Sequence, residues 1–286
     1  MAANDEDLTA RETHFAFGRN WASYARAIGR PEIDEAIAGL ARLLGGETLE
    51  GRRFLDIGSG SGLHALAAFA LGAREVVALD LDPDSVATTQ AVLARHAPGR
   101  PAHVAEASVF ALAPADYGRF DVVYSWGVLH HTGDLRRALR GAAALVAPGG
   151  LFIFALYRRI WLDAFWRREK RWYAQASPQA QARARALFVA LFRLGLAVTG
   201  RRFAAYVAAY RRQRGMDYDH DVHDWLGGWP YESILPQEVE TLLGELGFAR
   251  VRAFVARGFT IGGRRIGVFG SGCDEYVYRR VSDDPR

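Results

Sequence analysis

The sequence predicts a doubly wound α/β fold, in which helices cover both faces of a seven-stranded, mostly parallel sheet and a helical lid insertion interrupts the order. Short apolar runs alternate with helical segments from residue 52, and this alternation is typical of strands joined by crossover helices. The first, second, fourth and fifth runs are almost continuously apolar, as in strands that are buried on both faces. Of the 286 residues, 50% are hydrophobic and 24% are charged, so we expect a packed core.

The individual elements follow from local signals. Residues 19–44 are predicted to be helical, because Pro31 is placed to start a second helix and Gly45 and Gly46 to end it. We expect strands at 54–57, 75–80, 102–105, 120–125, 151–157, 249–256 and 274–280. Helices are expected at 62–72, 83–96, 133–146 and 236–247.

This order divides the chain into three parts. We expect an N-terminal helical cap at residues 1–50, a core at 51–157 and 236–286, and a helical substrate lid at 158–235. Open α/β sheets bind ligands outside the carboxyl ends of their strands, so the insertion would lie over the ligand site.

The strongest motif is a glycine-rich turn after the first strand, Phe54-Leu55-Asp56-Ile57-Gly58-Ser59-Gly60-Ser61-Gly62. Glycines allow a sharp turn and let a ligand approach the main chain closely. A dinucleotide-binding turn has the spacing G-x-G-x-x-G, whereas this one has D-x-G-x-G-x-G. The acid, Asp56, would repel a pyrophosphate, but directly or through its solvent shell it suits the α-ammonium group of an amino-acid ligand.

A nucleoside site is indicated by the strands that follow. About 20 residues after the turn, the second strand ends in Asp80, which is placed to accept hydrogen bonds from both ribose hydroxyls. Leu81 can flank an adenine ring. After the third strand, the Ser108 hydroxyl and the Val109 amide lie where the edge of an adenine is usually contacted.

Residues 54–157 resemble the class I S-adenosylmethionine-dependent methyltransferases, especially the quinone-biosynthesis and small-molecule O-methyltransferase groups. The matching segments are DIGSGSG, VVALDLDPDSV, FDVVYSWGVLHH and LVAPGGLFIFALY, in the family's order and spacing. FAFGRNW, DWLGGWPYE and GSGCDEYVYR resemble a narrower bacterial subgroup with an unsettled substrate. One departure is Ser108, where the family often has Asp.

The resemblance implies a Rossmann-like fold, with S-adenosylmethionine as the cofactor and S-adenosylhomocysteine as the product. It also implies cofactor roles for Asp56, Gly58, Gly60, Gly62 and Asp80. Leu81, Ser108, Val109 and Ser125 are the further residues that we expect to bind the cofactor. We expect no metal.

Two histidines follow the fourth strand, at the reactive end of the cofactor if the fold is as predicted. Methyl transfer is an in-line displacement, and a hydroxyl acceptor must also lose its proton to a base. His130 or His131 is a candidate for that base, because a neutral imidazole titrates near working pH. Alternatively, one histidine orients a loop and the other only packs.

Acidic residues and histidines alternate over residues 217–224, inside the expected lid. His220 and Asp221 are further catalytic candidates, as an acid/base pair. A divalent metal site is an alternative, because Asp217, Asp221 and Asp224 share one helical stripe. A third interpretation is an acidic first turn of a helix that pairs with nearby arginines.

Aromatic residues are expected to form the acceptor site. Phe15, Phe17, Trp21 and Tyr24 either fold over the cofactor, where aromatic faces meet the sulfonium, or pack a helix on the sheet edge. The predicted acceptor-binding residues are Trp21, Tyr24, Trp126, Tyr157, Asp224, Trp225 and Tyr231.

The lid contains two basic, aromatic stretches, at residues 157–173 and 201–214. They suit an anionic small molecule, RNA phosphates or a membrane surface, or are simply solvated. Nucleic acid is disfavoured because residues 125–128, SWGV, lack the N/D-P-P-Y/F signature of amino-directed nucleic-acid methylation. The oligomeric state is not predicted.

The favoured function is therefore methyl transfer to a hydroxyl of a small-molecule acceptor. The alternatives are an RNA (tRNA) methyltransferase and a non-catalytic S-adenosylmethionine-binding protein. A nicotinamide dehydrogenase is disfavoured, because no Tyr-x-x-x-Lys pair can be built around Lys170, the only lysine.

The composition of the chain also bears on its cellular location and on the role of its single cysteine. We expect a cytoplasmic protein, because the first residues are acidic and polar, unlike a signal peptide. The apolar stretch 186–198 contains Arg193 and is shorter than the ~20 residues of a membrane span. Cys273 is the only cysteine, which excludes an intramolecular disulfide and a cysteine zinc site.

Overall fold

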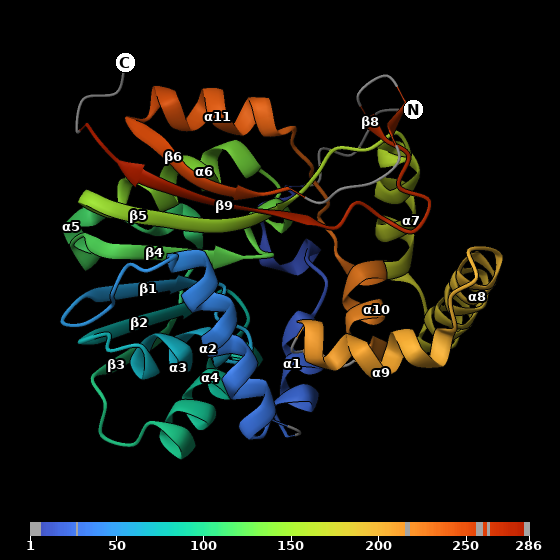
Figure 1. Cartoon of the computed structure of the whole chain (residues 1–286), viewed down its shortest axis with the longest axis horizontal. Helices are drawn as coiled ribbons and strands as arrows, with labels where there is room; N and C mark the ends of the chain where they lie inside the picture. The colour runs from blue at the N-terminus through green and yellow to red at the C-terminus, as the bar shows by residue number, and fades with distance from the viewer. Residues whose placement is uncertain (1–6, 27, 215–217, 256–259, 262–263, 283–286) are drawn as a thin grey trace.

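The computed structural model describes residues 7–26, 28–214, 218–255, 260–261 and 264–282. It confirms the predicted seven-stranded sheet, in the order β3-β2-β1-β4-β5-β9-β6 (Figure 1). Only β9 is antiparallel to its neighbours. The strands are β1 Arg53–Ile57, β2 Glu75–Asp80, β3 Ala102–Glu106, β4 Phe120–Trp126, β5 Val146–Tyr157, β6 Phe248–Phe254 and β9 Cys273–Arg280.

Helices cover both faces of the sheet, which explains why the central strands are continuously apolar. One face packs against α2 Arg30–Leu44, α3 Leu63–Ala70 and α4 Pro83–His96. The other packs against α6 Leu135–Ala144, α11 Pro236–Glu245 and the short helix η2 Val109–Ala111. The described part also contains α1 Phe17–Ala25, α5 Pro114–Tyr117, η1 Arg11–Thr13 and η3 Leu129–His131.

Helix boundaries follow the expected signals. Pro31 stands in the first turn of α2, and Gly45 ends that helix with φ of 55°, a left-handed conformation that glycine adopts readily. Asp82 caps α4 by accepting a hydrogen bond from the Asp84 amide at 2.9 Å. A short antiparallel pair of strands that was not predicted, β7 Thr260–Ile261 and β8 Arg264–Arg265, precedes β9.

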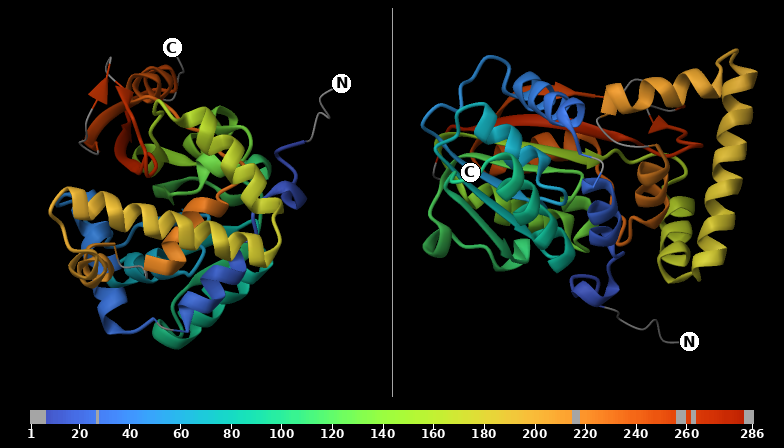
Figure 2. Two further views of the ribbon diagram at one scale, coloured as in Figure 1. Left: turned by 90° about the vertical axis from the view of Figure 1, so that its right-hand side faces the viewer. Right: turned by 90° about the horizontal axis from the view of Figure 1, so that it is seen from below.

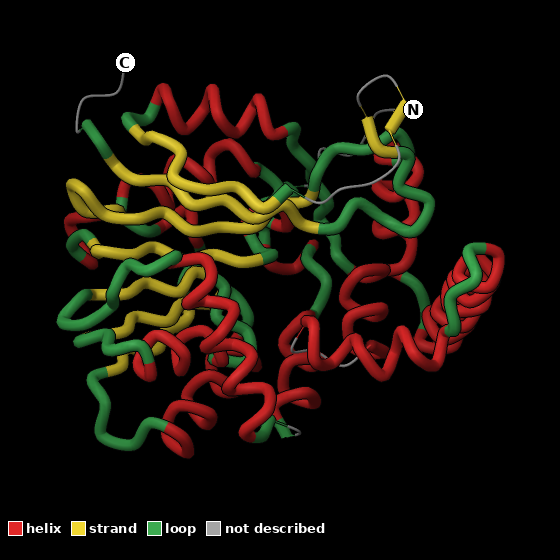
Figure 3. The backbone as a smooth tube through the Cα atoms, in the orientation of Figure 1, coloured by secondary structure: helices red, strands yellow, loops and turns green. Residues whose placement is uncertain are grey.

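The helical segment 158–235 lies beyond the carboxyl ends of the central strands (Figures 1 and 3). It contains α7 Asp163–Gln175, α8 Pro178–Val198, α9 Phe203–Arg214 and α10 Tyr218–Gly227. Its helices share a core that is separate from the two sheet cores and mainly aromatic. None of the helices among the described residues combines the length and apolar character that crossing a membrane requires.

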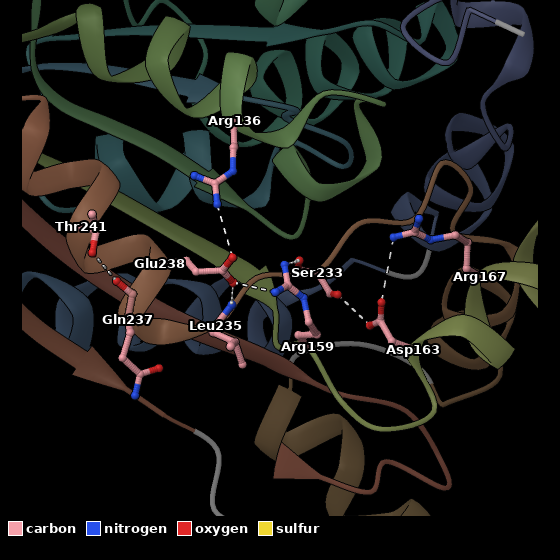
Figure 4. A network of polar contacts seen from close by, with 9 residues as sticks. All are labelled: Arg136, Arg159, Asp163, Arg167, Ser233, Leu235, Gln237, Glu238 and Thr241. Carbon is pink, nitrogen blue, oxygen red and sulfur yellow. Dashed lines mark hydrogen bonds and ion pairs between the residues drawn. The ribbon is translucent and has the colours of Figure 1, made fainter. Parts of the chain in front are cut away.

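Both ends of this segment are joined at one place, next to the end of β5. The Ile234 amide donates to the Tyr157 carbonyl at 3.0 Å, and the Arg159 amide donates to the Ile234 carbonyl at 3.1 Å. Glu238 of α11 forms ion pairs with Arg159 at 2.9 Å and with Arg136 at 3.3 Å (Figure 4). The helices are therefore fixed to the sheet domain at their base.

Candidate active site

The glycine turn has a backbone that only glycine adopts without strain. Gly58, Gly60 and Gly62 have φ of 78°, 53° and 77°. A Cβ atom at Gly58 would lie 2.4 Å from the Val128 side chain, and one at Gly60 would lie 3.3 Å from the Trp21 ring. The turn is thus closely packed and presents main-chain atoms rather than side chains.

Asp80 connects this turn to β2. Its two carboxylate oxygens accept hydrogen bonds from the Gly60 and Asp82 amides, each at 2.9 Å. A carboxylate has about four acceptor positions, so both oxygens retain capacity for further donors. Burial raises the pKa of Asp80 to about 6, although the two amides lower it.

Asp56 lies near the end of β1, and its buried Oδ2 atom has no hydrogen-bond partner among the described residues. Burial, together with the nearby Asp80 carboxylate, raises the pKa of Asp56 to about 7. Two buried carboxylates beside a nucleoside-sized cradle favour a cationic ligand. These residues fit S-adenosylmethionine, which carries an ammonium, a sulfonium and a ribose diol.

One cavity of about 660 Å³ extends from this cradle to the helical segment. Its volume falls in the usual range for small-molecule sites, roughly 300–1,000 Å³. Among the residues that the sequence singled out, it is lined by Gly58, Gly60, Asp80, Leu81, Ser108, Val109, Trp21, Tyr24, Trp126, Tyr157, Asp224, Trp225, His131 and Asp221. The structure thus brings together seven segments of the chain: residues 21–24, 58–60, 80–81, 108–109, 126–131, 157 and 221–225.

The N-terminal helix α1 closes the cavity beside the glycine turn. The Gly18 amide donates to Asp82 at 2.9 Å, and Phe17, Trp21 and Tyr24 all line the cavity. Phe15 instead packs against Phe17 and His223, within the helical segment. Most of the expected aromatic cluster therefore faces the ligand space.

Six singled-out residues do not line the cavity in the described structure: Asp56, Gly62, Ser125, His130, His220 and Tyr231. Gly62 directly precedes α3, and a Cβ atom at Gly62 would lie 3.0 Å from the Cα atom of Thr89. The Ser125 hydroxyl donates to the Ile57 carbonyl at 3.0 Å, so it ties β4 to β1. The Tyr231 hydroxyl donates to Asp163 at 3.1 Å.

His220 is not among the residues that line the cavity, and its ring packs against α1. Its ring makes an edge contact with Tyr24, at 6.1 Å between centroids, and its Nε2 lies 3.5 Å from the Ser23 hydroxyl. This position gives no support to the catalytic role expected for it. Asp217 of the same cluster lies outside the described residues.

The two histidines after β4 have different surroundings. His130 is fully buried, stacks on Tyr157 at 3.8 Å between centroids, and accepts a hydrogen bond from the Tyr157 amide at its Nδ1. His131 borders the cavity, and its Nδ1 lies 2.7 Å from the Pro230 carbonyl. Burial lowers the pKa of His131 to about 3, so its ring is neutral and only weakly basic.

Two carboxylates from α10 reach the cavity at the opposite end from the glycine turn. Asp221 accepts a hydrogen bond from the Tyr210 hydroxyl, and burial raises its pKa to about 7. Asp224 accepts from the Asn20 side-chain amide at 2.7 Å, and burial raises its pKa strongly. The carboxyl group of Asp221 therefore changes charge near neutral pH.

Lys170, on α7, is a residue of this end that the functional prediction missed. It is fully buried, and its ammonium nitrogen lies 3.6 Å from the centroid of the Trp225 ring. Within the described part of the chain this nitrogen has no hydrogen-bond partner. Burial lowers the pKa of Lys170 to about 7, although Glu169, Asp224 and Asp221 raise it. Its status as the only lysine was the one available signal in the sequence.

A second missed group lines the cavity beside α2. Glu275 of β9 accepts two hydrogen bonds from Arg42, each at 2.8 Å, and one from the Trp126 indole at 3.0 Å. These partners come from distant parts of the chain, so no local spacing could indicate them. Among the described residues, no group of three His, Cys, Asp or Glu side chains is arranged to hold a metal.

Sequence relatives match part of the chain. It is 41% identical over 122 residues to the ubiquinone biosynthesis O-methyltransferase of Alkalilimnicola ehrlichii, which covers 42% of this chain and 47% of that protein. It is 39% identical over 111 residues to the tRNA U34 carboxymethyltransferase of Alcanivorax borkumensis, which covers 38% of this chain and 34% of that protein. The chain thus spans less than half the length of these curated relatives.

Solved structures share the fold. The magnesium protoporphyrin IX methyltransferase of Synechocystis PCC 6803 with bound SAM superposes with a TM-score of 0.56 at 14% identity, over 98% of this chain and all of that one. An S-adenosylmethionine-dependent methyltransferase from Mesorhizobium loti gives a TM-score of 0.51 at 20% identity, over 85% of this chain and 96% of that one. The family model described as "Methyltransferase domain" matches residues 28–199, more than half of the sequence. The chain therefore belongs to the methyltransferase-domain family.

Proposed function

We propose that this chain is an S-adenosylmethionine-dependent methyltransferase that methylates a hydroxyl oxygen of a small molecule. The observation that carries the proposal is the single cavity, which joins the glycine turn to the buried carboxylates of α10. Such continuity lets a cofactor and an acceptor meet without solvent between them. The ubiquinone O-methyltransferase relative supports a hydroxyl acceptor.

In this proposal, the cofactor supplies an electrophilic methyl group on a sulfonium centre. Asp80 holds the ribose through the acceptor capacity that its two amide contacts leave. Asp56, beneath the turn, stabilises the ligand's positive charge through space, because its buried Oδ2 atom makes no hydrogen bond to any described residue. Ser108 and Val109 border the adenine position.

Asp221 is the proposed base for the acceptor hydroxyl. A general base is most effective when its pKa lies near the working pH, and the pKa of Asp221 is raised to about 7. His131 has a much lower pKa, and its contact with the Pro230 carbonyl suits a role in fixing the loop after β4. Asp224 and Trp225 are proposed to border the acceptor.

We assign residues 158–235 the role of an acceptor lid, on a core formed by residues 51–157 and 236–286 with a cap at 1–50. The aromatic side chains that α8 and α9 present to the cavity suit a largely apolar acceptor: Phe188, Phe192, Tyr206 and Tyr210. The cytoplasmic location stays a prediction from the sequence.

The first test is calorimetric titration with S-adenosylmethionine, S-adenosylhomocysteine and NADH. We expect the first two to bind and NADH not to bind. Binding of NADH alone would overturn the proposal.

A tRNA methyltransferase is the second candidate, because one relative acts on tRNA and the helical segment is rich in arginine. Phosphate contacts make such binding strongly salt-dependent. Tight tRNA binding at low salt that weakens steeply with added salt would favour it, and no binding at low salt would exclude it.

A further inference from the structure

Helix α8 exposes an apolar stripe along its outer side. Leu187, Leu191, Leu194 and Val198 are 62%, 50%, 61% and 80% exposed. At about 100° per residue these positions fall within one narrow sector of the helix. Arg183, one turn before Leu187, lies in the same sector and places a positive charge at the end of the apolar stripe. A contiguous apolar face of this kind marks a surface that meets an apolar partner.

The other side of α8 faces the cavity. Phe188 and Phe192, which alternate with the exposed leucines along the helix, line the space proposed for the acceptor. Figure 2 shows α8 as the outermost helix on this side of the molecule, in both views. A single helix therefore separates the acceptor cavity from whatever the stripe contacts.

The positive charge of the surrounding segment indicates which kind of partner can cover the apolar stripe. Residues 158–214 contain 14 Lys and Arg but only two Asp and Glu, and α8 itself has three arginines and no acid. A symmetric pair of such surfaces would bring like charges together. RNA is a poor match for the stripe's centre, because aliphatic side chains do not stack on bases as aromatic ones do.

We propose that the outer face of α8 docks on an anionic lipid bilayer. The leucines insert at the boundary of the acyl chains, and arginines such as Arg183 meet the headgroup phosphates. Resting on the proposed function, this docking places the aromatic acceptor cavity one helix away from the bilayer. The acceptor class is then an apolar, membrane-partitioned molecule that carries a hydroxyl.

The test is flotation of the full chain with vesicles of phosphatidylcholine containing about 30% phosphatidylglycerol, against vesicles of phosphatidylcholine alone. We expect the chain to float with the anionic vesicles and at least about tenfold less with the neutral ones. The double variant Leu191→Glu/Leu194→Glu is expected to lose anionic binding by about tenfold or more. Failure of the unmodified chain to float with anionic vesicles would overturn the proposal.

Two matched controls separate the stripe from general surface effects. Val281→Glu changes a residue that is 64% exposed at the end of β9, and we expect it to float normally. Arg183→Glu should weaken flotation about fivefold or more, whereas Arg140→Glu on the exposed surface of α6 should not. Equal loss from a stripe variant and its control would contradict the assignment, as would normal flotation of the double leucine variant.

Sedimentation without lipid tests the competing occupant. A dimer that the leucine substitutions disperse would assign the stripe to a second copy and overturn the lipid proposal. Calorimetry with S-adenosylmethionine on the same samples keeps the two proposals distinct. Vesicle binding without cofactor binding would refute the methyltransferase function and leave the membrane surface intact.

Discussion

The two ends of the cavity are constructed differently. At the cofactor end, the main chain defines the site: three glycines with positive φ form the turn, and two backbone amides hold Asp80. At the proposed acceptor end, side chains from separate helices define it, including Phe188 of α8, Tyr206 of α9 and Asp221 of α10. A site formed by backbone tolerates little change, whereas a site formed by side chains can be altered position by position.

The largest expected effect is at the acceptor end. Asp221→Asn removes the proposed base, so kcat should fall by about 100-fold or more. In the unmodified enzyme the carboxyl is protonated below its pKa of about 7, so activity should rise as pH increases through 7 and then level off. The pH–rate profile measures this directly.

Asp219→Asn, two residues away on an exposed part of α10, is the matched control and should keep both rate and profile. A profile of Asp221→Asn that still rises through pH 7 would assign the base to another group.

At the cofactor end, Asp80→Ala should weaken S-adenosylmethionine binding by about 100-fold, because hydrogen bonds to a charged group contribute roughly 1.5–3 kcal/mol each. Calorimetry measures the loss, and Asp116→Ala on exposed α5 is the control. Asp80→Asn keeps acceptor capacity and distinguishes ribose binding from support of the turn. Unchanged affinity in Asp80→Ala would remove Asp80 from the site.

A pair of glycines tests how rigid the backbone-defined end is. Gly58 and Gly99 have nearly the same φ, 78° and 74°, but a Cβ at Gly58 would overlap Val128 whereas one at Gly99 would meet nothing within 4 Å. Gly99→Ala should lower the free energy of unfolding by about 1–2 kcal/mol. Gly58→Ala should lower it by a further ~1–3 kcal/mol and weaken cofactor binding.

Thermal or urea unfolding of both variants provides the comparison. Equal losses of stability would mean that the turn yields to the extra methyl group, and the contrast between the two ends would then weaken.

The smallest effect concerns Lys170. Its positive charge lowers the pKa of Asp221, so Lys170→Met should shift the midpoint of the pH–rate profile to higher pH by about one unit. Folding should change little, because an apolar side chain of similar length replaces a buried ammonium. Arg168, exposed on the same helix, provides the control, and Arg168→Met should leave the pH–rate profile unchanged. An unchanged profile in Lys170→Met would mean that the charge of Lys170 does not influence the pKa of the base.

The same contrast explains how far sequence reasoning reached. The seven-stranded, mostly parallel sheet and the place of Asp80 at the end of β2 were predictable, because strand periodicity and the glycine spacing are local features of the chain. The pairing of Glu275 with Arg42 and Trp126, and the placement of Lys170 over Trp225, depend on helix packing between distant segments. His220 illustrates the limit, because its helix was expected but the direction of its side chain was not.

The burial of Lys170 also makes this residue a useful spectroscopic probe. Because it is the only lysine, isotopic labelling of this amino acid places a single NMR probe next to Trp225, which lines the cavity. The ring current of Trp225, whose centroid lies 3.6 Å from the ammonium nitrogen, should shift that probe's resonance away from the value of a free lysine. A single signal would then follow both the protonation of this end and the arrival of an acceptor.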